Sequence, residues 1–344
     1  MSKNAPDPGP VFAAGRLVAG VAAIGLAVLA TWAVTRSSSD YVVTLLALLF
    51  VNATLAVSLT VSNGLSGLFS LGHPAFMTIG AYVAAILTFP AARKSTMLPA
   101  LPEFMASVQW PLLPSMAAAG LAGLVVAILV GFPVLRLRGH YLAVATLGLI
   151  IIVQGLATNW SGLTRGGAGL SGIPRLGNIW WALGLLVVAV VVMWRVKFSS
   201  LGRAMMATRE NDLAAECTGI DTTRIRMIAF VGGAVFAAVA GALFAHLISV
   251  VTPKTYSVIL AFNLVVMVVI GGQGSIAGAI VAAAAITALS ESLRPVEESV
   301  GMYGLSQVIV AVALILVLFF RPNGLFGSSE PAMLRRLFNG RDDP

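Results

Sequence analysis

Long apolar runs recur along this chain and leave it few ways to fold. A helix needs about 20 mostly apolar residues to cross the hydrocarbon core of a bilayer. Because 58% of the residues are hydrophobic and only 10% are charged, a water-soluble core could not enclose the apolar surface. We therefore expect an all-α polytopic integral membrane protein. The clearest spans are predicted at 17–35, 41–60, 112–135, 141–158, 179–194, 227–250 and 305–320.

Three further apolar runs are shorter, at 74–89, 257–270 and 276–290. With a rise of about 1.5 Å per residue, runs of this length cross only the thinnest core, so we expect them to be tilted, broken or re-entrant. The first window follows Lys3 and Arg16, as in a secretion signal, but its apolar run is longer than a signal core. The sequence predicts about ten transmembrane or re-entrant helices.

Lysines and arginines orient such a chain, because they accumulate in short cytoplasmic loops. A ten-helix arrangement places most of the 21 cations on one side, with both termini. The prediction is a cytoplasmic tail at 1–16, a transmembrane domain at 17–320 with a cytoplasmic loop at 196–226, and a cytoplasmic tail at 321–344. The net charge of +8 then faces lipid headgroups, and nucleic acid is not an expected partner.

Two glycine-rich segments interrupt the apolar pattern, "SNGLSGLFSLGHP" at 62–74 and "GGQGSIAG" at 271–278. Unwound backbone is tolerated at membrane depth only inside protein or beside a cavity, so broken helices often mark a transport pathway. The alternative is that the glycines let helices pack closely. The candidate pathway residues are Asn63, Ser70, Gly72, His73, Gly271, Gly272, Gly274 and Ser275.

Catalytic and metal sites find little support in the residues. Each Lys lacks the preceding Gly of a phosphate-binding loop, and the three histidines have no ligand-spaced partners. His246 lies within a span, where a hydrogen bond to a neighbouring helix is expected and a contact with the substrate path is the alternative. The single cysteine, Cys217, excludes an internal disulfide. Every Asp and Glu falls in a loop, a tail or a helix end, which disfavours ion-coupled transport without excluding it.

The most charged interval is "GRAMMATRENDLAAECTGIDTTRIR" at 202–226. Asn211 is a good N-cap and Gly219 a natural stop, so a helix of about two turns is predicted between them. Asp221 is expected to cap the next span. Leu213 and Cys217 give the short helix an apolar side, and the acidic side fits a protein partner beneath the membrane. A solvated loop anchored by its arginines is the alternative.

Four stretches are the most specific in the chain: "SLGHPAF", "GGAGLSGIP", "GRAMMATRENDLAAECTGI" and "GGQGSIAG". In order and spacing they resemble the LivM-type permeases of branched-chain amino-acid ABC importers, and the resemblance covers most of residues 40–327. It implies a multi-pass subunit of the bacterial inner membrane that is not itself an enzyme and binds no cofactor. The expected partners are a LivH-type permease, two ABC ATPase subunits of the LivG and LivF type that bind ATP-Mg, and a periplasmic solute-binding protein.

The resemblance also implies that the loop before the late span carries a coupling helix, which sits in a groove of the ATPase. The family signature has Glu-Ala-Ala followed by Gly, whereas here Glu216 follows Ala214 and Ala215 and precedes Gly219. The role of the loop therefore transfers more securely than that of any one side chain. The candidate coupling residues are Arg209, Glu210, Asp212, Ala214, Ala215, Glu216 and Gly219.

Several questions stay open at the level of sequence. Related permeases carry urea, short amides or aromatic acids, and the residues do not identify the solute. The outer loop at 159–177 suits docking of the binding protein, an outer gate or a plain connection. A self-contained channel, a secondary carrier and an intramembrane enzyme are the other classes, and the last lacks a plausible catalytic pair within the spans.

Overall fold

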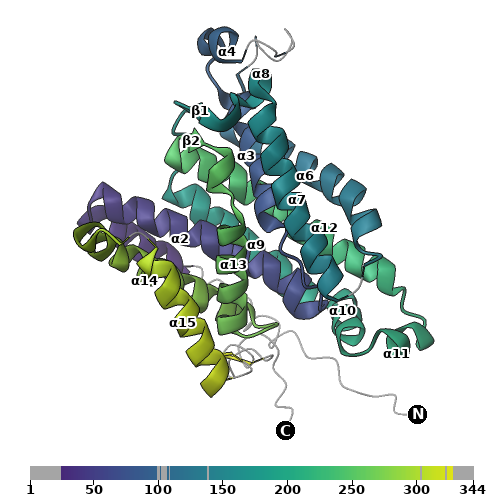
Figure 1. Ribbon diagram of the computed structural model, residues 1–344. Coiled ribbons are helices and arrows are strands. Elements are labelled where there is room, and N and C mark those ends of the chain that lie inside the picture. The colour runs from purple at the N-terminus through teal and green to yellow at the C-terminus, as the bar shows by residue number, and fades with distance from the viewer. Residues whose placement is uncertain are drawn as a thin grey trace.

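The computed structural model describes residues 25–98, 101, 107, 109–137, 139–302, 304–321 and 324–327. These residues form helices almost throughout, with one small two-stranded sheet (Figure 1). The all-α polytopic membrane fold is confirmed. The predicted tail at 1–16, the first part of the 17–35 window and most of the tail at 321–344 lie outside the described residues.

The helices follow one another with short connections, after a first helix that is described through residues 25–37. The membrane-length and near-membrane-length helices are α2 (Asp40–Leu59), which continues as the π-helix η1 (Thr60–Leu65), α3 (His73–Thr88), α6 (Leu112–Val134), α7 (His140–Asn159), α9 (Ile179–Lys197), α12 (Thr222–Ile248), α13 (Val258–Gly271), α14 (Ile276–Val300) and α15 (Leu305–Phe320). The short elements are α4 (Ala91–Met97), α8 (Ser161–Thr164), η2 (Gly166–Ala168), β1 (Leu170–Ser171), α10 (Ser200–Glu210), α11 (Asp212–Cys217), β2 (Val250–Val251) and η3 (Pro253–Thr255).

Seven helices among the described residues are long and apolar enough to cross a membrane. The expected length was wrong for one of the late runs. The run at 276–290 belongs to a helix of 25 residues, Ile276–Val300. The run at 257–270 forms α13, which has 14 residues and reaches the 19 of a candidate span only together with η3, and Leu305–Phe320 has 16. The apolar run of α14 stops early because its last turns carry Glu291, Arg294 and Glu297, which leave the helix intact.

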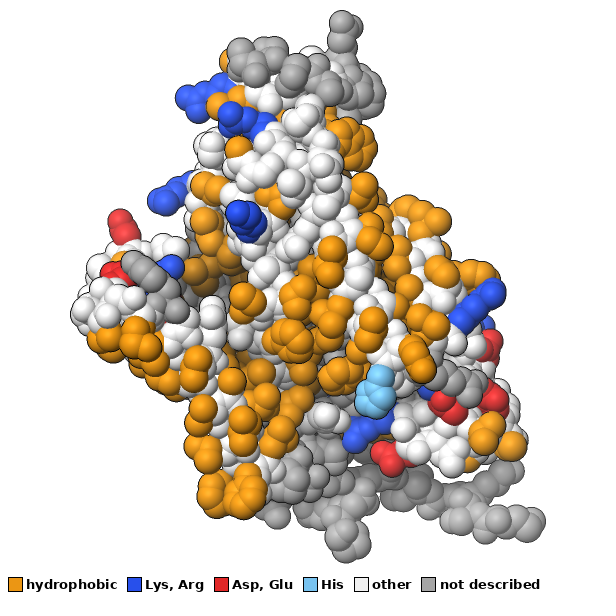
Figure 2. Space-filling view, viewed as in Figure 1, with side chains coloured by type: hydrophobic (Ala, Val, Ile, Leu, Met, Phe, Trp, Pro, Cys, Tyr) orange, Lys and Arg blue, Asp and Glu red, His pale blue; other side chains and the backbone are white. Residues whose placement is uncertain are grey.

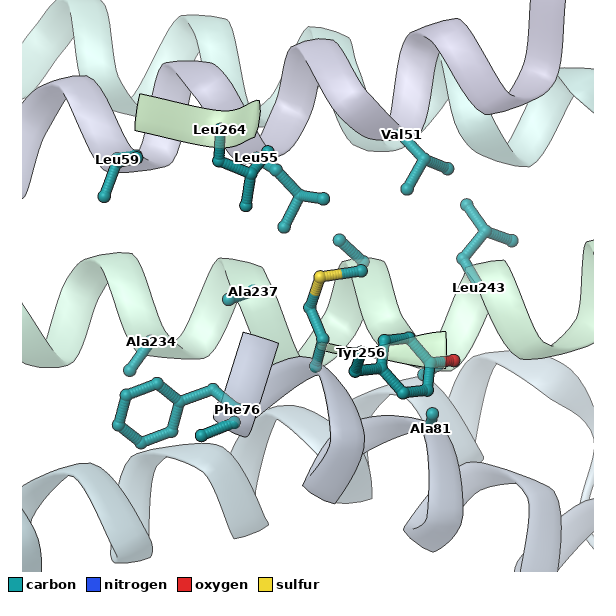
Figure 3. Close-up of a cluster of buried hydrophobic side chains, with 14 of the residues drawn as sticks. Val51, Leu55, Leu59, Phe76, Ala81, Ala234, Ala237, Leu243, Tyr256 and Leu264 are labelled. Carbon is teal, nitrogen blue, oxygen red and sulfur yellow. The ribbon is translucent and has the colours of Figure 1, made fainter. Parts of the chain in front are cut away.

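Helix α12 lies at the centre and packs against α2, α3 and α6. Its contact with α3 is very close, because a Cβ on Gly80 would lie 2.0 Å from the carbonyl oxygen of Ala238, and one on Gly241 would lie 2.2 Å from that of Met77. Small residues allow this approach between membrane helices. Figure 3 shows side chains of α2, such as Leu55, above the small residues of α12. Glycine does serve close packing here.

The helix bundle has two distinct ends (Figure 1). We call one the sheet end, where α4, α8, β1 and β2 lie, and the other the α10–α11 end. At the sheet end β1 pairs with β2 antiparallel, with Leu170 opposite Val251. Figure 2 shows hydrophobic side chains over the middle of the molecule and charged side chains mainly at its margins, as expected where the middle faces lipid.

Candidate functional site

The loop at 196–226 folds as its capping residues predict. The side chain of Asn211 accepts a hydrogen bond from the N–H of Ala214 at 3.1 Å and begins α11. Gly219 has φ of +85° and ends it, a conformation that glycine adopts without strain. Asp221 accepts a hydrogen bond from the N–H of Arg224 at 3.0 Å and caps α12. The predicted short helix and its boundaries are confirmed.

The acidic side of α11 is turned toward α12. Asp212 forms an ion pair with Arg226, and Glu216 accepts a hydrogen bond from the hydroxyl of Thr222 at 2.8 Å. Both bonds join α11 to the first turns of α12, and Ala215 is buried beneath them. Two carboxylates of the loop are therefore engaged within the chain.

The outward side of the loop mixes apolar and polar residues. Leu213 has 69% of its surface exposed, and Cys217 is also exposed. Glu210 has an exposed side chain whose distance to Arg209 is 3.9 Å, at the limit of an ion pair. An exposed leucine beside a carboxylate can dock into an apolar groove with a basic rim.

Arg209 points back into its own chain. One guanidinium nitrogen, Nη1, donates to the carbonyl oxygen of Gly64 at 2.7 Å and to that of Gln273 at 3.4 Å. Its aliphatic stem packs on Gly67, whose φ is +68° and where a Cβ would lie 3.0 Å from Cγ of Arg209. Arg209 thus contacts both glycine-rich segments that the sequence singled out.

Lys197 makes a matching contact from the end of α9. Its Nζ donates to the carbonyl oxygen of Gly274 at 2.6 Å, and the side chain is buried. The next residue of that turn, Ser275, caps α14 by accepting from the N–H of Gly278 at 3.0 Å. Neither Lys197 nor Gly64 was singled out from the sequence. The only available signal was a lysine at the start of the loop at 196–226.

The two glycine-rich segments meet directly at the α10–α11 end. A Cβ on Gly64 would lie 2.7 Å from the backbone nitrogen of Gly274, closer than real Cβ atoms come. The end of the π-helix η1 therefore closes against the turn between α13 and α14. This contact brings Gly274 and Ser275 near the loop at 196–226.

Residues near the end of the described chain cover the same turn. The N–H of Leu325 donates to the carbonyl of Ile270 at 2.8 Å, and that of Phe326 donates to Gly271 at 3.3 Å. A Cβ on Gly272, whose φ is +110°, would lie 2.4 Å from the carbonyl oxygen of Gly327. Gly271 and Gly272 are thus needed for backbone packing.

The segment 66–72 between η1 and α3 is held by side chains. Asn63 donates from Nδ2 to the carbonyl of Ser70 at 2.9 Å and accepts from the N–H of Ser70 at 3.2 Å. The N–H of Leu71 donates to the hydroxyl of Thr146, on α7, at 2.9 Å. This stapled segment leads to Gly72, the N-cap of α3.

His73, the first residue of α3, is buried inside the bundle. It packs on Gly233, midway along α12, where a Cβ would lie 3.2 Å from Cε1 of the ring. Its Nε2 has no hydrogen-bond partner among the described residues. The short α3 consequently begins within the bundle instead of at its edge. Asn63, Ser70, Gly72 and His73 lie along one segment, which is joined to the Gly271–Ser275 turn through η1 and Arg209.

His246 makes the expected hydrogen bond to a neighbouring helix. Its Nδ1 lies 2.7 Å from the carbonyl oxygen of Ala242, and its Nε2 lies 2.8 Å from the hydroxyl of Thr88 on α3. Because a carbonyl can only accept, Nδ1 carries the proton, and in the neutral ring Nε2 accepts from Thr88. The prediction for His246 is confirmed.

Exposed cations lie at the sheet end. Arg93, Arg175 and Lys254 are exposed there, and Arg165 is half-buried. Lys94 is buried, and this burial lowers the pKa of its amine. The described residues of 88–98, 160–178 and 249–257 include no Asp or Glu. Within the described ranges, no three His, Cys, Asp or Glu residues gather as a metal site would require.

Known proteins resemble this chain over most of its length. A family model described as the permease component of branched-chain amino acid transport systems matches residues 41–318. The high-affinity branched-chain amino acid permease LivM of Salmonella typhimurium is 32% identical over 313 residues, covering 81% of this chain and 68% of the relative.

Two proteins of Escherichia coli strain K12 also match. Its LivM permease is 31% identical over 354 residues, covering 93% of this chain and 76% of the relative. Its LivH permease is 28% identical over 306 residues, covering 81% and 92%. No solved structure matches the chain.

Proposed function

The chain belongs to the family of permease components of branched-chain amino acid transport systems, and we propose that it is the LivM-type transmembrane subunit of an ATP-driven importer. It moves leucine, isoleucine and valine across the membrane and hydrolyses no ATP itself. The observation that carries this proposal is the match of the family from α2 to α15, residues 41–318.

Its partners in this proposal are those of the transport system. They are a LivH-type permease, two ATPase subunits of the LivG and LivF type that bind ATP-Mg, and a periplasmic binding protein that delivers the amino acid. Relatives named both LivM and LivH support the pairing of two permeases. The complex lies in the bacterial inner membrane, with about ten spans, and the α10–α11 end and both termini face the cytoplasm.

The coupling helix in this assembly is α11. Asp212 and Glu216 hold it on α12, so Leu213 and Glu210 are the side chains offered to the ATPase groove. Gly219 ends the helix and Ala215 packs it on the permease, while Ala214 is exposed beside Leu213. Movement of the ATPases then displaces α12 through the bonds of Asp212 and Glu216 to Arg226 and Thr222.

The pathway in this proposal is closed at the cytoplasmic end by the two glycine-rich segments. Gly64 packs on Gly274 there, and Gly271, Gly272 and Ser275 shape the same turn. Deeper in the bundle, Asn63 and Ser70 hold the unwound segment before Gly72 and His73. Unwound backbone enclosed by protein is characteristic of transporter pathways.

The sheet end receives the binding protein. Exposed Arg93, Arg175 and Lys254 give this end a positive surface, which complements acidic groups on a soluble partner. Charge pairs at the rim of an interface mainly raise the association rate.

Reconstitution tests the function. The chain is co-expressed with its permease, ATPase and binding-protein partners, purified in mild detergent and placed in liposomes. Uptake of radiolabelled leucine is measured with internal ATP and, separately, with imposed proton or sodium gradients. We expect uptake that requires ATP and the binding protein, and none with an ATPase that cannot hydrolyse ATP.

The other outcomes identify the other functions. Uptake of urea, an amide or an aromatic acid in place of leucine would change the substrate but keep the mechanism. Uptake driven by an ion gradient, or by this chain alone, would replace the importer with a carrier or a channel.

A further inference from the structure

We infer that Arg209 and Lys197 form a clamp that ties the coupling loop to the closed cytoplasmic end of the pathway. The clamp consists of the two cations and the three backbone carbonyls they contact, those of Gly64, Gln273 and Gly274. The inference rests on the proposed function, because it assigns the connection between the coupling loop and the glycine-rich closure.

The carbonyls of the clamp lie at a helix end and in a turn between helices. Gly64 lies in the last turn of η1, whereas Gln273 and Gly274 lie in the turn between α13 and α14. The last carbonyls of a helix lack intrahelical partners and carry partial negative charge, so Arg209 stabilises the end of η1. A hydrogen bond from a charged donor is roughly twice as strong as a neutral one. These bonds are strong enough to hold two helix ends together.

The two cations bracket α10. Lys197 ends α9 just before α10 begins, and Arg209 lies in its last turn. Any tilt of α10 therefore changes the length of at least one of these bonds. The two shortest contacts, to Gly64 at 2.7 Å and to Gly274 at 2.6 Å, leave the usual N–H···O range of about 2.7–3.2 Å after a displacement of about 1 Å, so such a shift breaks one or pulls the turn with it.

The direction of Arg209 distinguishes this role from direct contact with an ATPase. Its guanidinium contacts its own chain and its side chain is 27% exposed, whereas Glu210 beside it is 78% exposed. The neighbouring cation Arg203 on the same helix contacts only the carbonyl of Phe198, at 3.4 Å, among the bonds described for it. Arg203 is thus a matched control that does not reach either turn.

The first test measures leucine transported per ATP hydrolysed by the reconstituted complex. Arg209→Lys keeps the charge, but the side chain is shorter, so its ammonium does not reach both carbonyls that Nη1 of Arg209 contacts. Lys197→Met keeps the apolar stem and deletes the donor. We expect a fall of about tenfold in this ratio for each, the effect of losing one charge-assisted hydrogen bond. Arg203→Lys is expected to keep the wild-type ratio.

The second test reads the closure itself. Spin labels are placed at Phe69→Cys and Gln273→Cys, both exposed, in a Cys217→Ser background that removes the native exposed thiol. In the nucleotide-free complex, Arg209→Lys is expected to lengthen and broaden the distance distribution between the labels, and Arg203→Lys to leave it unchanged.

The clamp is overturned if the ratio and the label distance both stay at wild-type values in Arg209→Lys and Lys197→Met. It is also overturned if uptake and ATP hydrolysis fall in equal proportion, because that indicates loss of folded complex. If the wild-type complex itself takes up no leucine, the proposed function fails, while the label distances still test whether the cations hold the closure.

Discussion

The two ends of the helix bundle differ in which groups donate hydrogen bonds to backbone carbonyls near the helix ends. At the sheet end, backbone pairs with backbone between β1 and β2, and the N–H groups of Gly172 and Ile173 both donate to the carbonyl of Ser249 at 3.2 Å. At the α10–α11 end, long cationic side chains reach the backbone of helix ends from a separate loop. Both arrangements satisfy carbonyls that the helices leave unpaired.

The two arrangements differ in whether the hydrogen bonds can break without displacing the backbone. A ladder of short backbone bonds separates only if the chain itself is displaced, whereas the side chains of Arg209 and Lys197 can change rotamer and release their carbonyls. The sheet end is therefore built as a fixed cap, and the α10–α11 end as a closure that another subunit can operate. Four variants test this contrast, one of them a double substitution, beginning with the largest expected effect.

Gly64→Val acts on the closure directly. The new side chain meets the backbone nitrogen of Gly274 at 2.7 Å from its Cβ, and backbone cannot yield as a flexible side chain does. Overpacking of this kind costs up to about 3 kcal/mol. We expect leucine uptake to fall roughly 100-fold, the factor that corresponds to this free energy. Uptake in proteoliposomes, normalised to assembled complex, measures it.

Gly148→Ala is the matched control for that substitution. Gly148 lies within α7 with nothing within 4 Å of an added Cβ, so alanine should be tolerated and should favour the helix slightly. Equal uptake by Gly64→Val and Gly148→Ala complexes would contradict a closure built on the contact between Gly64 and Gly274.

Leu213→Asp tests what the outward side of α11 does. An exposed leucine that enters a groove loses about 2 kcal/mol of binding on such a change, which is roughly 30-fold in affinity. We expect the ATPase subunits to dissociate during purification while the two permeases stay together. Leu213→Met should retain them. If the Leu213→Asp complex kept all of its ATPase subunits, docking would depend on the acidic residues Glu210, Asp212 and Glu216 instead.

The sequence predicted the local structure of the α10–α11 loop better than its orientation. Asn211, Gly219 and Asp221 determine where helices begin and end through bonds spanning three or four residues, so their roles are visible in the order of residues. Which side of α11 faces outward depends on Arg226 and Thr222, which come from the next helix. Periodicity identified two sides of α11, and the acidic side was expected to meet the partner, whereas Asp212 and Glu216 bond to α12.

The clamp illustrates a contact that local patterns do not reveal. Arg209 bonds to Gly64 across 145 positions, and Lys197 to Gly274 across 77. Glycine-rich interruptions could be recognised at both turns, but their meeting depends on helix packing. The predicted end of α14 was wrong for another reason. Charged residues in its last turns ended the apolar run before the helix itself ended.

Arg175→Glu together with Lys254→Glu tests the fixed cap as a docking surface. Reversing two exposed rim charges slows association with an acidic partner and lessens its dependence on salt. We expect the binding protein to stimulate ATP hydrolysis about threefold to tenfold less at low ionic strength, with little difference at high salt. An unchanged response at low salt would place the binding protein elsewhere.

Thr88→Val has the smallest expected effect and tests the contrast most narrowly. Valine removes the hydroxyl that bonds to Nε2 of His246 at 2.8 Å, and hydrogen bonds between membrane helices contribute about 0.6 kcal/mol on average. Since this bond belongs to the fixed cap, thermal stability should fall slightly while leucine transported per ATP stays the same. Thr88→Ser keeps the hydroxyl and should match the wild type in both. A changed transport ratio in Thr88→Val alone would show that the sheet end also moves during transport, and the division between a fixed cap and an operated closure would be wrong.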